Sequence, residues 1–343
     1  MSHYTELPPA ALSAYSDLLT ALLRAPISAK GVCYITRTVK GRKYWYLQYV
    51  VGASKKSHYL GPDSEDLQNL IAAAKAKAAE DKDDRSVRER LVATGVAAGL
   101  ATVSMAEARV YEALVQSGLL EAGATLVGTH AFICLGNQLG VSWNTAMRTE
   151  DIDVGHDPRI LLATRNYKKD LGEELRKADR GFFAVPAFDR NKPSTRFRIR
   201  GKQLSVSILT PAIGKAEDKP VILPHLNLAA EPVRFLDYLI EDAQLAAVPH
   251  GAGLLVRIPN AGRFAIHKIV VSQRRPVTYA SKSRKDILQA AALFDCLREM
   301  RPGDIRLAAE AASKMPRRFL TQVRQGISAL PEEQRAWIKE IVF

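Results

Sequence analysis

Asp151 and Asp153 are separated by one apolar residue in the segment RTEDIDVG, residues 148–155. Residues two apart in a β-strand point to the same face, so both carboxylates would project together while Ile152 and Val154 point the other way. Paired carboxylates bind hard cations such as Mg²⁺, and two-metal sites use such ions to activate an attacking oxygen and to stabilise a leaving group. An acidic strand edge that faces solvent shows the same local pattern. The surrounding sequence must therefore decide between a metal site and a solvated edge.

The segment ATLVGTHAF, which precedes the acidic pair, is typical of a short strand that turns at Gly128 into a helix. We expect this helix to begin at Thr129 and to continue through Leu139. Backbone N–H groups at the start of a helix can bind a phosphate, and a glycine lets the phosphate approach the backbone closely. A plain strand-to-helix turn would have the same residues, so both interpretations stay open for this segment alone.

In this order, the strand, glycine turn, helix and acidic strand resemble the DNA polymerase β-like nucleotidyltransferase fold. More narrowly, the chain resembles a bacterial branch of nucleotidyltransferase-fold proteins related to the AbiEii-type toxins. Five segments carry this closer likeness across residues 105–295: LVGTHAF, TEDIDV, RGKQLSVSILTP, RFAIHKIVVSQRR and SKSRKDILQA. Their order along the chain is a stronger signal than any one of them.

The resemblance implies a Mg²⁺-dependent nucleotidyltransferase that binds an NTP such as ATP and transfers its NMP to an acceptor hydroxyl, with pyrophosphate leaving. It also implies roles for matching residues of this chain. Gly128 and Thr129 would contact the phosphates, with His130 beside them at the start of the helix. Asp151 and Asp153 would ligate Mg²⁺ and carry catalysis. Lys268 and Lys285 would face the triphosphate or the acceptor, and Asp286 would orient a basic neighbour. Without the resemblance, the histidine is more typical of packing and each lysine of an exposed helix.

Ser207 departs from the family pattern. The segment LSVSILTP has a serine where the family has an acidic residue, in a pattern close to Val-Asp-Leu-Leu-Thr-Pro. A neutral hydroxyl neither binds Mg²⁺ as a carboxylate does nor accepts a proton comparably. Either another carboxylate, such as Asp189 or Asp157, replaces it, or the protein keeps the pocket without efficient transfer. The sequence leaves these two outcomes open, with an active enzyme as the leading interpretation.

Residues 31–61 predict a small basic β-module. Apolar and aromatic residues alternate there and are interrupted by the turn-like segments KGRK and GASKK, which is typical of three antiparallel strands. KGRKYWYLQY and HYLGP also resemble the short basic β-modules found beside transposase and phage-integrase domains. Tyr44, Tyr46 and Tyr59 either stack on unpaired bases or form the core of the module, and the small size of the sheet favours the core. Six cations are candidates for nucleic-acid binding: Arg37, Lys40, Arg42, Lys43, Lys55 and Lys56.

The chain as a whole predicts an α+β protein, in which helices flank the mixed sheet of a nucleotidyltransferase fold. We expect four parts: an N-terminal helix and three-stranded β-module at 1–62, a helical linker at 63–104, a nucleotidyltransferase core at 105–225 and a mainly helical C-terminal domain at 226–343. In the linker, the charged run EDKDDRSVRER predicts a break before a second helical segment. The linker is then a helix pair, with one long helix as the alternative. After Pro232, VRFLDYLIEDAQ predicts an amphipathic helix.

Charge and missing motifs narrow the function classes. The chain of 343 residues has a formal net charge of +13, and its cations gather in several segments, which favours a polyanionic partner. Walker A, GxSxG and HExxH motifs are absent, which argues against a P-loop ATPase and against common hydrolases. Cys33, Cys134 and Cys296 lack the spacing of a zinc site. No secretion signal is visible and the apolar run at 91–106 is too short for a membrane span, so we expect a cytoplasmic protein without a membrane partner.

RNA, and tRNA in particular, is the first expected acceptor, because the β-module supplies a second contact surface, with DNA as an alternative. The competing interpretation is a catalytically weakened nucleotidyltransferase-fold protein that binds nucleic acid or is regulated by a protein partner, such as an antitoxin. A third interpretation is transfer of nucleotides to protein side chains.

Overall fold

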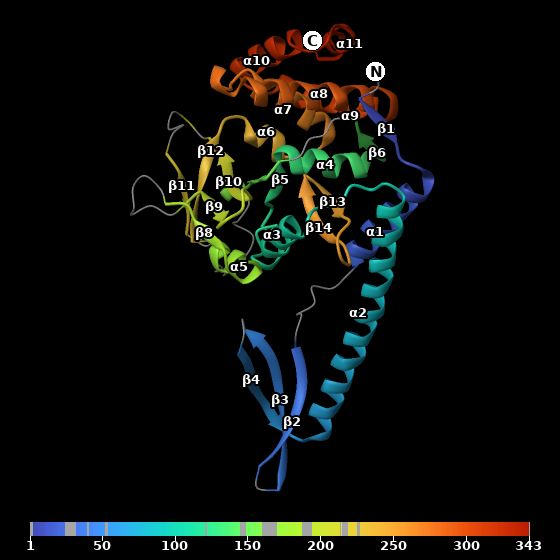
Figure 1. Cartoon of the computed structure of the whole chain (residues 1–343), viewed down its shortest axis with the longest axis vertical. Coiled ribbons are helices and arrows are strands. Elements are labelled where there is room, and N and C mark those ends of the chain that lie inside the picture. The colour runs from blue at the N-terminus through green and yellow to red at the C-terminus, as the bar shows by residue number, and fades with distance from the viewer. Residues whose placement is uncertain are drawn as a thin grey trace.

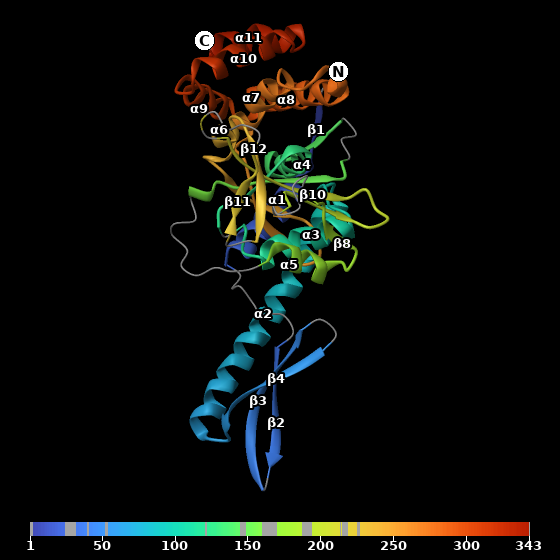
Figure 2. The ribbon, with the colours of Figure 1, turned by 90° about the vertical axis from the view of Figure 1, so that its left-hand side faces the viewer.

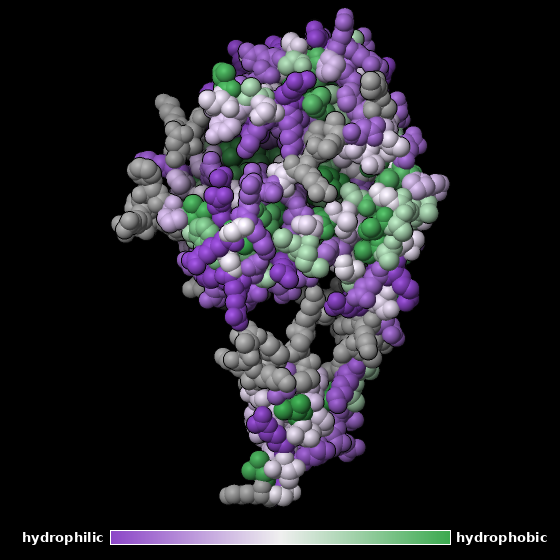
Figure 3. Space-filling model, viewed as in Figure 1, coloured by the Kyte–Doolittle hydropathy of each residue, from purple (hydrophilic) through white to green (hydrophobic). Residues whose placement is uncertain are grey.

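A computed structural model shows a compact body and a small sheet that is joined to it by one long helix (Figures 1 and 2). The residues that it describes are 3–24, 32–39, 41–51, 54–120, 122–144, 149–159, 170–186, 194–212, 214, 219–224 and 227–342. Figure 1 shows the C-terminal helices stacked at one end of the molecule and the small sheet at the other. On the face shown in Figure 3, hydrophilic side chains cover much of the surface, with scattered apolar patches between them.

A seven-stranded mixed sheet lies at the centre of the body. The strands along its main path are, in order, β11 (Val221–Leu223), β12 (Leu228–Val233), β10 (Ser205–Pro211), β7 (Asp151–Gly155) and β5 (Thr125–Val127). β10 runs parallel to β7 and β12, whereas β5 is antiparallel to β7. Two further strands, β9 (Arg196–Ile199) and β8 (Phe182–Ala184), extend the sheet from β10. The α+β fold class expected from the sequence is confirmed.

One face of the two central strands is part of the hydrophobic core. Ile152 and Val154 of β7, and Val206 and Ile208 of β10, are completely buried. Because side chains alternate along a strand, the intervening residues of both strands point to the other face. That face is the one that bears the acidic pair.

The described part of the body also contains, around the central sheet, three helices and two small antiparallel sheets. These elements are α3 (Met105–Gln116), α4 (Gly128–Leu139), α5 (Leu171–Ala178), the strand pair β13 (Gln244–Val248) and β14 (Leu254–Ile258), and the strand pair β1 (Tyr4–Glu6) and β6 (Val141–Trp143). α3 begins with a capping box, in which Ser104 and Glu107 satisfy each other's free backbone N–H groups. This cap fixes the direction of the first turn of α3, which borders a cavity described below.

The C-terminal region is mainly helical, as the sequence indicates. Its helices are α6 (Leu236–Ile240), α7 (Ala261–Ser272), α8 (Ala280–Met300), α9 (Pro302–Ser313), α10 (Arg317–Ser328) and α11 (Glu332–Val342). α7 is central among them and is buried along most of its length. A Cβ at Gly326 would lie only 2.5 Å from the backbone oxygen of Ile269, so glycine permits the close crossing of α10 over α7.

The helix expected from VRFLDYLIEDAQ is much shorter than the sequence indicates. Val233 is the last residue of β12, α6 spans only Leu236–Ile240, and Gln244 begins β13. Pairing of β12 with β10 and of β13 with β14 takes the two ends of the segment into sheets. Tertiary strand pairing overrides the helical periodicity here.

The linker is one continuous helix, α2 (Glu65–Ala97), so the single long helix, one of the two alternatives left open, is confirmed and the break at EDKDDRSVRER is wrong. Arg85 and Glu89 lie one turn apart and form an ion pair of 2.9 Å, which a helix accommodates on its surface. The N-terminal helix α1 (Pro9–Arg24) packs against the C-terminal part of α2 through a small cluster that includes Leu18 and Val92. The structure therefore places α1 with the body, although the sequence groups it with the β-module.

The three-stranded sheet expected from residues 31–61 is confirmed. It consists of β2 (Val32–Val39), β3 (Arg42–Val51) and β4 (Ser54–Pro62), antiparallel and in that order. Trp45 ties it to the start of α2, because its Nε1 donates to Asp63 Oδ1 at 2.6 Å and the Lys75 ammonium lies 5.3 Å from its ring centre. The module therefore stands beside the end of α2 that lies away from the body (Figure 2).

Candidate functional site

Asp151 and Asp153 lie on the same face of the central sheet. In the parallel pair β7 and β10, Asp151 is opposite Ser205 and Asp153 is opposite Ser207. The Ser205 hydroxyl donates to Asp151 Oδ1 at 2.7 Å. Both carboxylates line a cavity of about 260 Å³, which we call the carboxylate cavity. Its walls are Gly128, Thr129, Thr149, Asp151, Asp153, Arg196, Ser207, Leu209, Glu231, Lys268, Arg275, Lys282, Lys285 and Asp286.

Gly128 brings the start of α4 against the acidic strand. Val127 pairs with Asp153 across the antiparallel strands β5 and β7, and Gly128 follows with a φ of +65°. A Cβ at this position would lie 3.0 Å from Asp153 Oδ2. Glycine is thus required both by the backbone angle and by the approach of the carboxylate. Thr129, the next residue, also lines the carboxylate cavity.

Asp153 is in a site that favours neutralisation or a bound cation. Burial, reinforced by the charge of Asp151, raises the pKa of Asp153 to about 6. Two adjacent carboxylates offer the hard oxygen ligands that Mg²⁺ prefers, with water and phosphate oxygens to complete its coordination. Within the ranges that the structure describes, no three His, Cys, Asp or Glu side chains cluster closely enough to hold a metal ion. The donor set therefore fits a cation held by two protein carboxylates.

Ser207 occupies the position beside Asp153 at which the resemblance requires a third carboxylate. Its hydroxyl accepts a hydrogen bond of 3.1 Å from Arg196 Nε, on the neighbouring strand β9. The position is thus tied to a fixed positive charge. Arg196 was missed from the sequence, although alternation in RFRI (residues 196–199) puts it on the face opposite the buried Phe197 and Ile199.

The two replacements considered for the third carboxylate fare differently. Asp157 is bound by its neighbour Arg159, with 2.6 Å between Asp157 Oδ2 and Arg159 Nη2, and it does not line the carboxylate cavity. It therefore does not replace the missing group. Asp189 lies outside the described residues. Glu231 does line the cavity: it is an exposed residue of β12, opposite Leu209 of β10, and no local pattern in the sequence predicts this role.

The positive wall of the carboxylate cavity comes from α7, α8 and the turn between them. Lys268 Nζ lies 2.7 Å from Asp286 Oδ1, and Arg275 Nε lies 2.5 Å from Asp286 Oδ2. Although burial opposes ionisation, these two cations hold the pKa of Asp286 below its ordinary value. Asp286 thus fixes the direction of two cations. Lys285 is half-buried, and its burial together with the charge of Lys268 lowers its pKa.

A comparison with protein families agrees with this geometry. The model of a family described as Nucleotidyltransferase matches residues 106–314, well over half of the chain. The chain belongs to this nucleotidyltransferase family. Comparisons with curated proteins and with solved structures give no match.

The match to the nucleotidyltransferase family includes every residue that lines the carboxylate cavity. It leaves out α1, α2 and the β-module. The nucleotidyltransferase region is thus the part that contains the acidic pair, the Gly128 turn and the positive wall. Among the described helices, none combines the length and apolar composition that a bilayer span requires.

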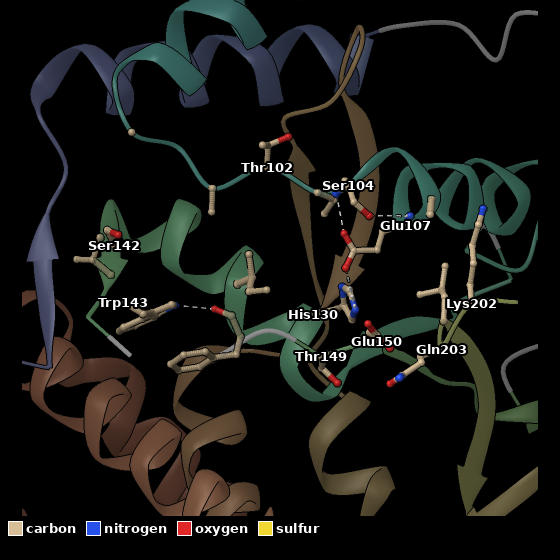
Figure 4. Close-up of a pocket in the computed structure, with 18 residues that line it drawn as sticks. Thr102, Ser104, Glu107, His130, Ser142, Trp143, Thr149, Glu150, Lys202 and Gln203 are labelled. Carbon is tan, nitrogen blue, oxygen red and sulfur yellow. Dashed lines mark hydrogen bonds and ion pairs between the residues drawn. The ribbon is translucent and has the colours of Figure 1, made fainter. Parts of the chain in front are cut away.

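His130 is the one predicted nucleotide-binding residue that does not line the carboxylate cavity. It is in the first turn of α4 and is almost fully buried, with Nδ1 2.6 Å from the Tyr111 hydroxyl. It lines instead a neighbouring cavity of about 850 Å³, which we call the side cavity (Figure 4). Burial lowers the pKa of His130, against the opposing charge of Glu107, so its neutral form is favoured.

The candidate nucleic-acid cations of the β-module are only partly described. Arg37, Arg42 and Lys43 are exposed on β2 and β3. Lys40 lies outside the described residues, and for Lys55 and Lys56 only the place in β4 is described. Of the aromatics, Tyr59 is 50% exposed and contacts both Tyr44 and Tyr46, with ring centres 6.0 Å and 5.5 Å apart. These rings pack on one another yet leave one of them open to solvent.

Proposed function

We propose that this member of the nucleotidyltransferase family is a Mg²⁺-dependent enzyme that transfers an NMP from an NTP, such as ATP, to an acceptor hydroxyl. The observation that carries the proposal is the placement of Asp151 and Asp153 on one strand face, against Gly128 and in a cavity that Lys268 also lines. A phosphate chain needs these three features together: carboxylates for the cation, open backbone N–H groups and fixed positive charge.

The residues of the chain act mainly by position and charge. The start of α4 at Gly128 and Thr129 contacts the phosphates, while Lys268, held by Asp286, neutralises the charge that gathers on the departing pyrophosphate. Mg²⁺ held by Asp151 and Asp153 would supply charge neutralisation and activation of the attacking oxygen. Arrangement of charge before the reaction is the largest contribution expected for such a site.

RNA, with tRNA foremost, is the acceptor that we propose. Support comes from the exposed arginines of the β-module, from Tyr59 beside them and from the net charge of +13. DNA is the alternative polyanion. We further propose a relation to AbiEii-type toxins, which would bring a regulatory protein partner.

Labelled NTP, Mg²⁺ and total cellular RNA test the enzyme. We expect metal-dependent label on RNA with the native chain, and a loss of at least about 100-fold in the double variant Asp151→Asn/Asp153→Asn. Asp242→Asn, at an exposed carboxylate outside the carboxylate cavity, is the matched control. Equal labelling by the native chain and the double variant would reject the proposed metal site.

A second candidate function is favoured by the Ser207 and Arg196 contact. The structure has a serine that is hydrogen-bonded to arginine at the position of the third carboxylate. This arrangement suits a protein that binds nucleotide or nucleic acid but transfers NMP only weakly. Ser207→Asp separates the two functions, because a carboxylate there would stand beside Asp153 and within reach of Arg196. Activity that rises sharply in this variant identifies a weakened enzyme. Activity that is high in the native chain and lost in the variant favours a complete site built without a third carboxylate.

A further inference from the structure

The side cavity borders directly on the carboxylate cavity. Thr149 lines both of them, His130 of the side cavity follows Thr129 of the carboxylate cavity, and Glu150 precedes Asp151. Figure 4 shows that the labelled residues of the side cavity come from α3 and the segment before it, α4, β6, the segment before β7 and the turn before β10. A ligand group in the side cavity would therefore lie next to the acidic strand.

The two cavities differ in charge. The carboxylate cavity has five cations in its wall, four of them from α7, α8 and the turn that joins these helices. The side cavity contains no residue of α7 or α8, and its charged wall residues are Glu107, Glu150 and Lys202. With two acidic groups and one basic group, the side cavity does not suit phosphates. It suits a neutral group that makes hydrogen bonds.

The wall of the side cavity contains a buried polar atom that makes no hydrogen bond to the described residues. His130 is 1% exposed, and its Nε2 makes no hydrogen bond within the part of the chain that the structure describes. Its ion-pair partner Glu107 Oε1 lies 3.9 Å away, which is too long for a direct hydrogen bond. Glu107 is itself fixed, because its Oε2 accepts from the Ser104 backbone N–H at 2.6 Å. The two side chains therefore form a fixed pair of polar atoms in the wall of the side cavity (Figure 4).

Another part of the wall is aromatic and rigid. Phe132 and Trp143 stack with ring centres 4.4 Å apart, and Trp143 Nε1 donates to the Phe132 backbone oxygen at 2.8 Å. These two contacts hold the rings in place, so this wall supplies shape and apolar contact. At about 850 Å³ the cavity accommodates a group the size of a nucleoside.

Transfer chemistry determines which substrate the side cavity serves. In phosphoryl-type transfer the attacking and leaving oxygens are roughly in line. The cations of α7 and α8 bind the leaving pyrophosphate, so the acceptor must approach from elsewhere around the acidic strand. The side cavity is a large concave space that adjoins that strand through Thr149 and lacks those cations.

We propose that the side cavity binds the 3′-terminal nucleoside of an RNA acceptor, with His130 and Glu107 contacting the edge of its base. This inference rests on the proposed transfer of NMP to RNA. The terminal hydroxyl oxygen forms a bond to the α-phosphorus, the bond from that phosphorus to the bridging oxygen breaks, pyrophosphate leaves and the hydroxyl proton passes to solvent. The strand phosphates stay outside the cavity.

Binding of short RNA to the full chain tests the inference. The probes are 5′-labelled octanucleotides that share one sequence and end in each of the four bases or in an abasic ribose, and fluorescence anisotropy gives each Kd. The native chain should bind at least one base-bearing end about tenfold more tightly than the abasic end. Binding of labelled ATP with Mg²⁺ is measured in parallel.

Three variants alter the side cavity and one serves as control. Ala106→Phe fills it from α3, His130→Asn removes Nε2 but keeps a partner for Tyr111, and Glu107→Gln removes the charge but retains the capping box. Each should bring the base-bearing and abasic ends within about twofold of each other, with the Kd for ATP changed by less than about twofold. Met105→Phe, at an exposed neighbouring position outside the cavity, should behave as the native chain.

Two results would overturn the inference while leaving the proposed function intact. One is a native chain that binds ATP and transfers label but does not distinguish base-bearing from abasic ends. The other is that Ala106→Phe weakens the binding of ATP and leaves the binding of RNA unchanged, which would assign the side cavity to the NTP. Failure of the proposed function itself looks different, because neither ATP binding nor labelling would then depend on Asp151 and Asp153.

Discussion

Replacing Asp153 by asparagine should stabilise the chain when divalent metal is absent. Burial and the neighbouring Asp151 raise the pKa of Asp153 from 3.8 to about 6. At about 1.4 kcal/mol for each pKa unit, this carboxylate destabilises the folded state by about 3 kcal/mol at neutral pH. The amide of Asp153→Asn carries no charge, so most of that penalty should disappear.

The sign follows from proton linkage. The folded chain holds the Asp153 proton more tightly than the unfolded chain, so its free energy of unfolding falls as pH rises from about 4 to about 6. Below about pH 4 the carboxyl is protonated in both states and the penalty is absent. Thermal unfolding in EDTA at pH 7.5 and at pH 4 measures the difference. We expect Asp153→Asn to raise Tm by roughly 3–6 °C at pH 7.5 and by little at pH 4.

Mg²⁺ supplies the second half of this test. A cation between Asp151 and Asp153 offsets their repulsion, so it should raise Tm of the native chain and leave that of Asp153→Asn nearly unchanged. Asp242→Asn, which removes an exposed carboxylate outside the carboxylate cavity, controls for net charge. The reasoning is refuted if, in EDTA at pH 7.5, Asp153→Asn is no more stable than the native chain while Asp242→Asn is unchanged.

Three further predictions concern the walls of the site and the β-module. Gly128→Ala should lower the affinity for labelled ATP with Mg²⁺ at least tenfold, about 1.4 kcal/mol. The added Cβ meets Asp153 Oδ2 at 3.0 Å, and the φ of +65° is strained for alanine. Equal affinity would show that ATP binding does not need the close approach of the Gly128 backbone to Asp153. Asp286→Asn should lower the free energy of unfolding by about 3 kcal/mol at pH 7, because it leaves Lys268 buried beside a neutral group. Urea titrations should show that this loss shrinks as pH falls toward and below 4, where Asp286 itself becomes protonated. Arg37→Gln should reduce the slope of log K for RNA against log salt by about 1, whereas an unchanged slope would remove this arginine from the contact surface.

Local features of the fold could be predicted because they depend on neighbours along the chain. The period of two in TEDIDV places Asp151 and Asp153 on one face, and Gly128 marks the turn from β5 into α4. The three strands of the β-module follow from alternation between turn-like segments. In α2, by contrast, the charged residues predict a break that the structure does not have, because a solvent-exposed helix accommodates them on its surface.

The sequence by itself determined the acidic pair, its glycine turn and the serine at the third position, because strand period and backbone freedom are properties of a few consecutive residues. Only the tertiary structure decided what surrounds them. In that structure Arg196 donates a hydrogen bond to Ser207, and Lys268 and Arg275 form ion pairs with Asp286. The side chain of His130 lines the separate side cavity. These contacts join residues that are distant along the chain, and the pKa of Asp153 depends on burial that arises only when those elements pack.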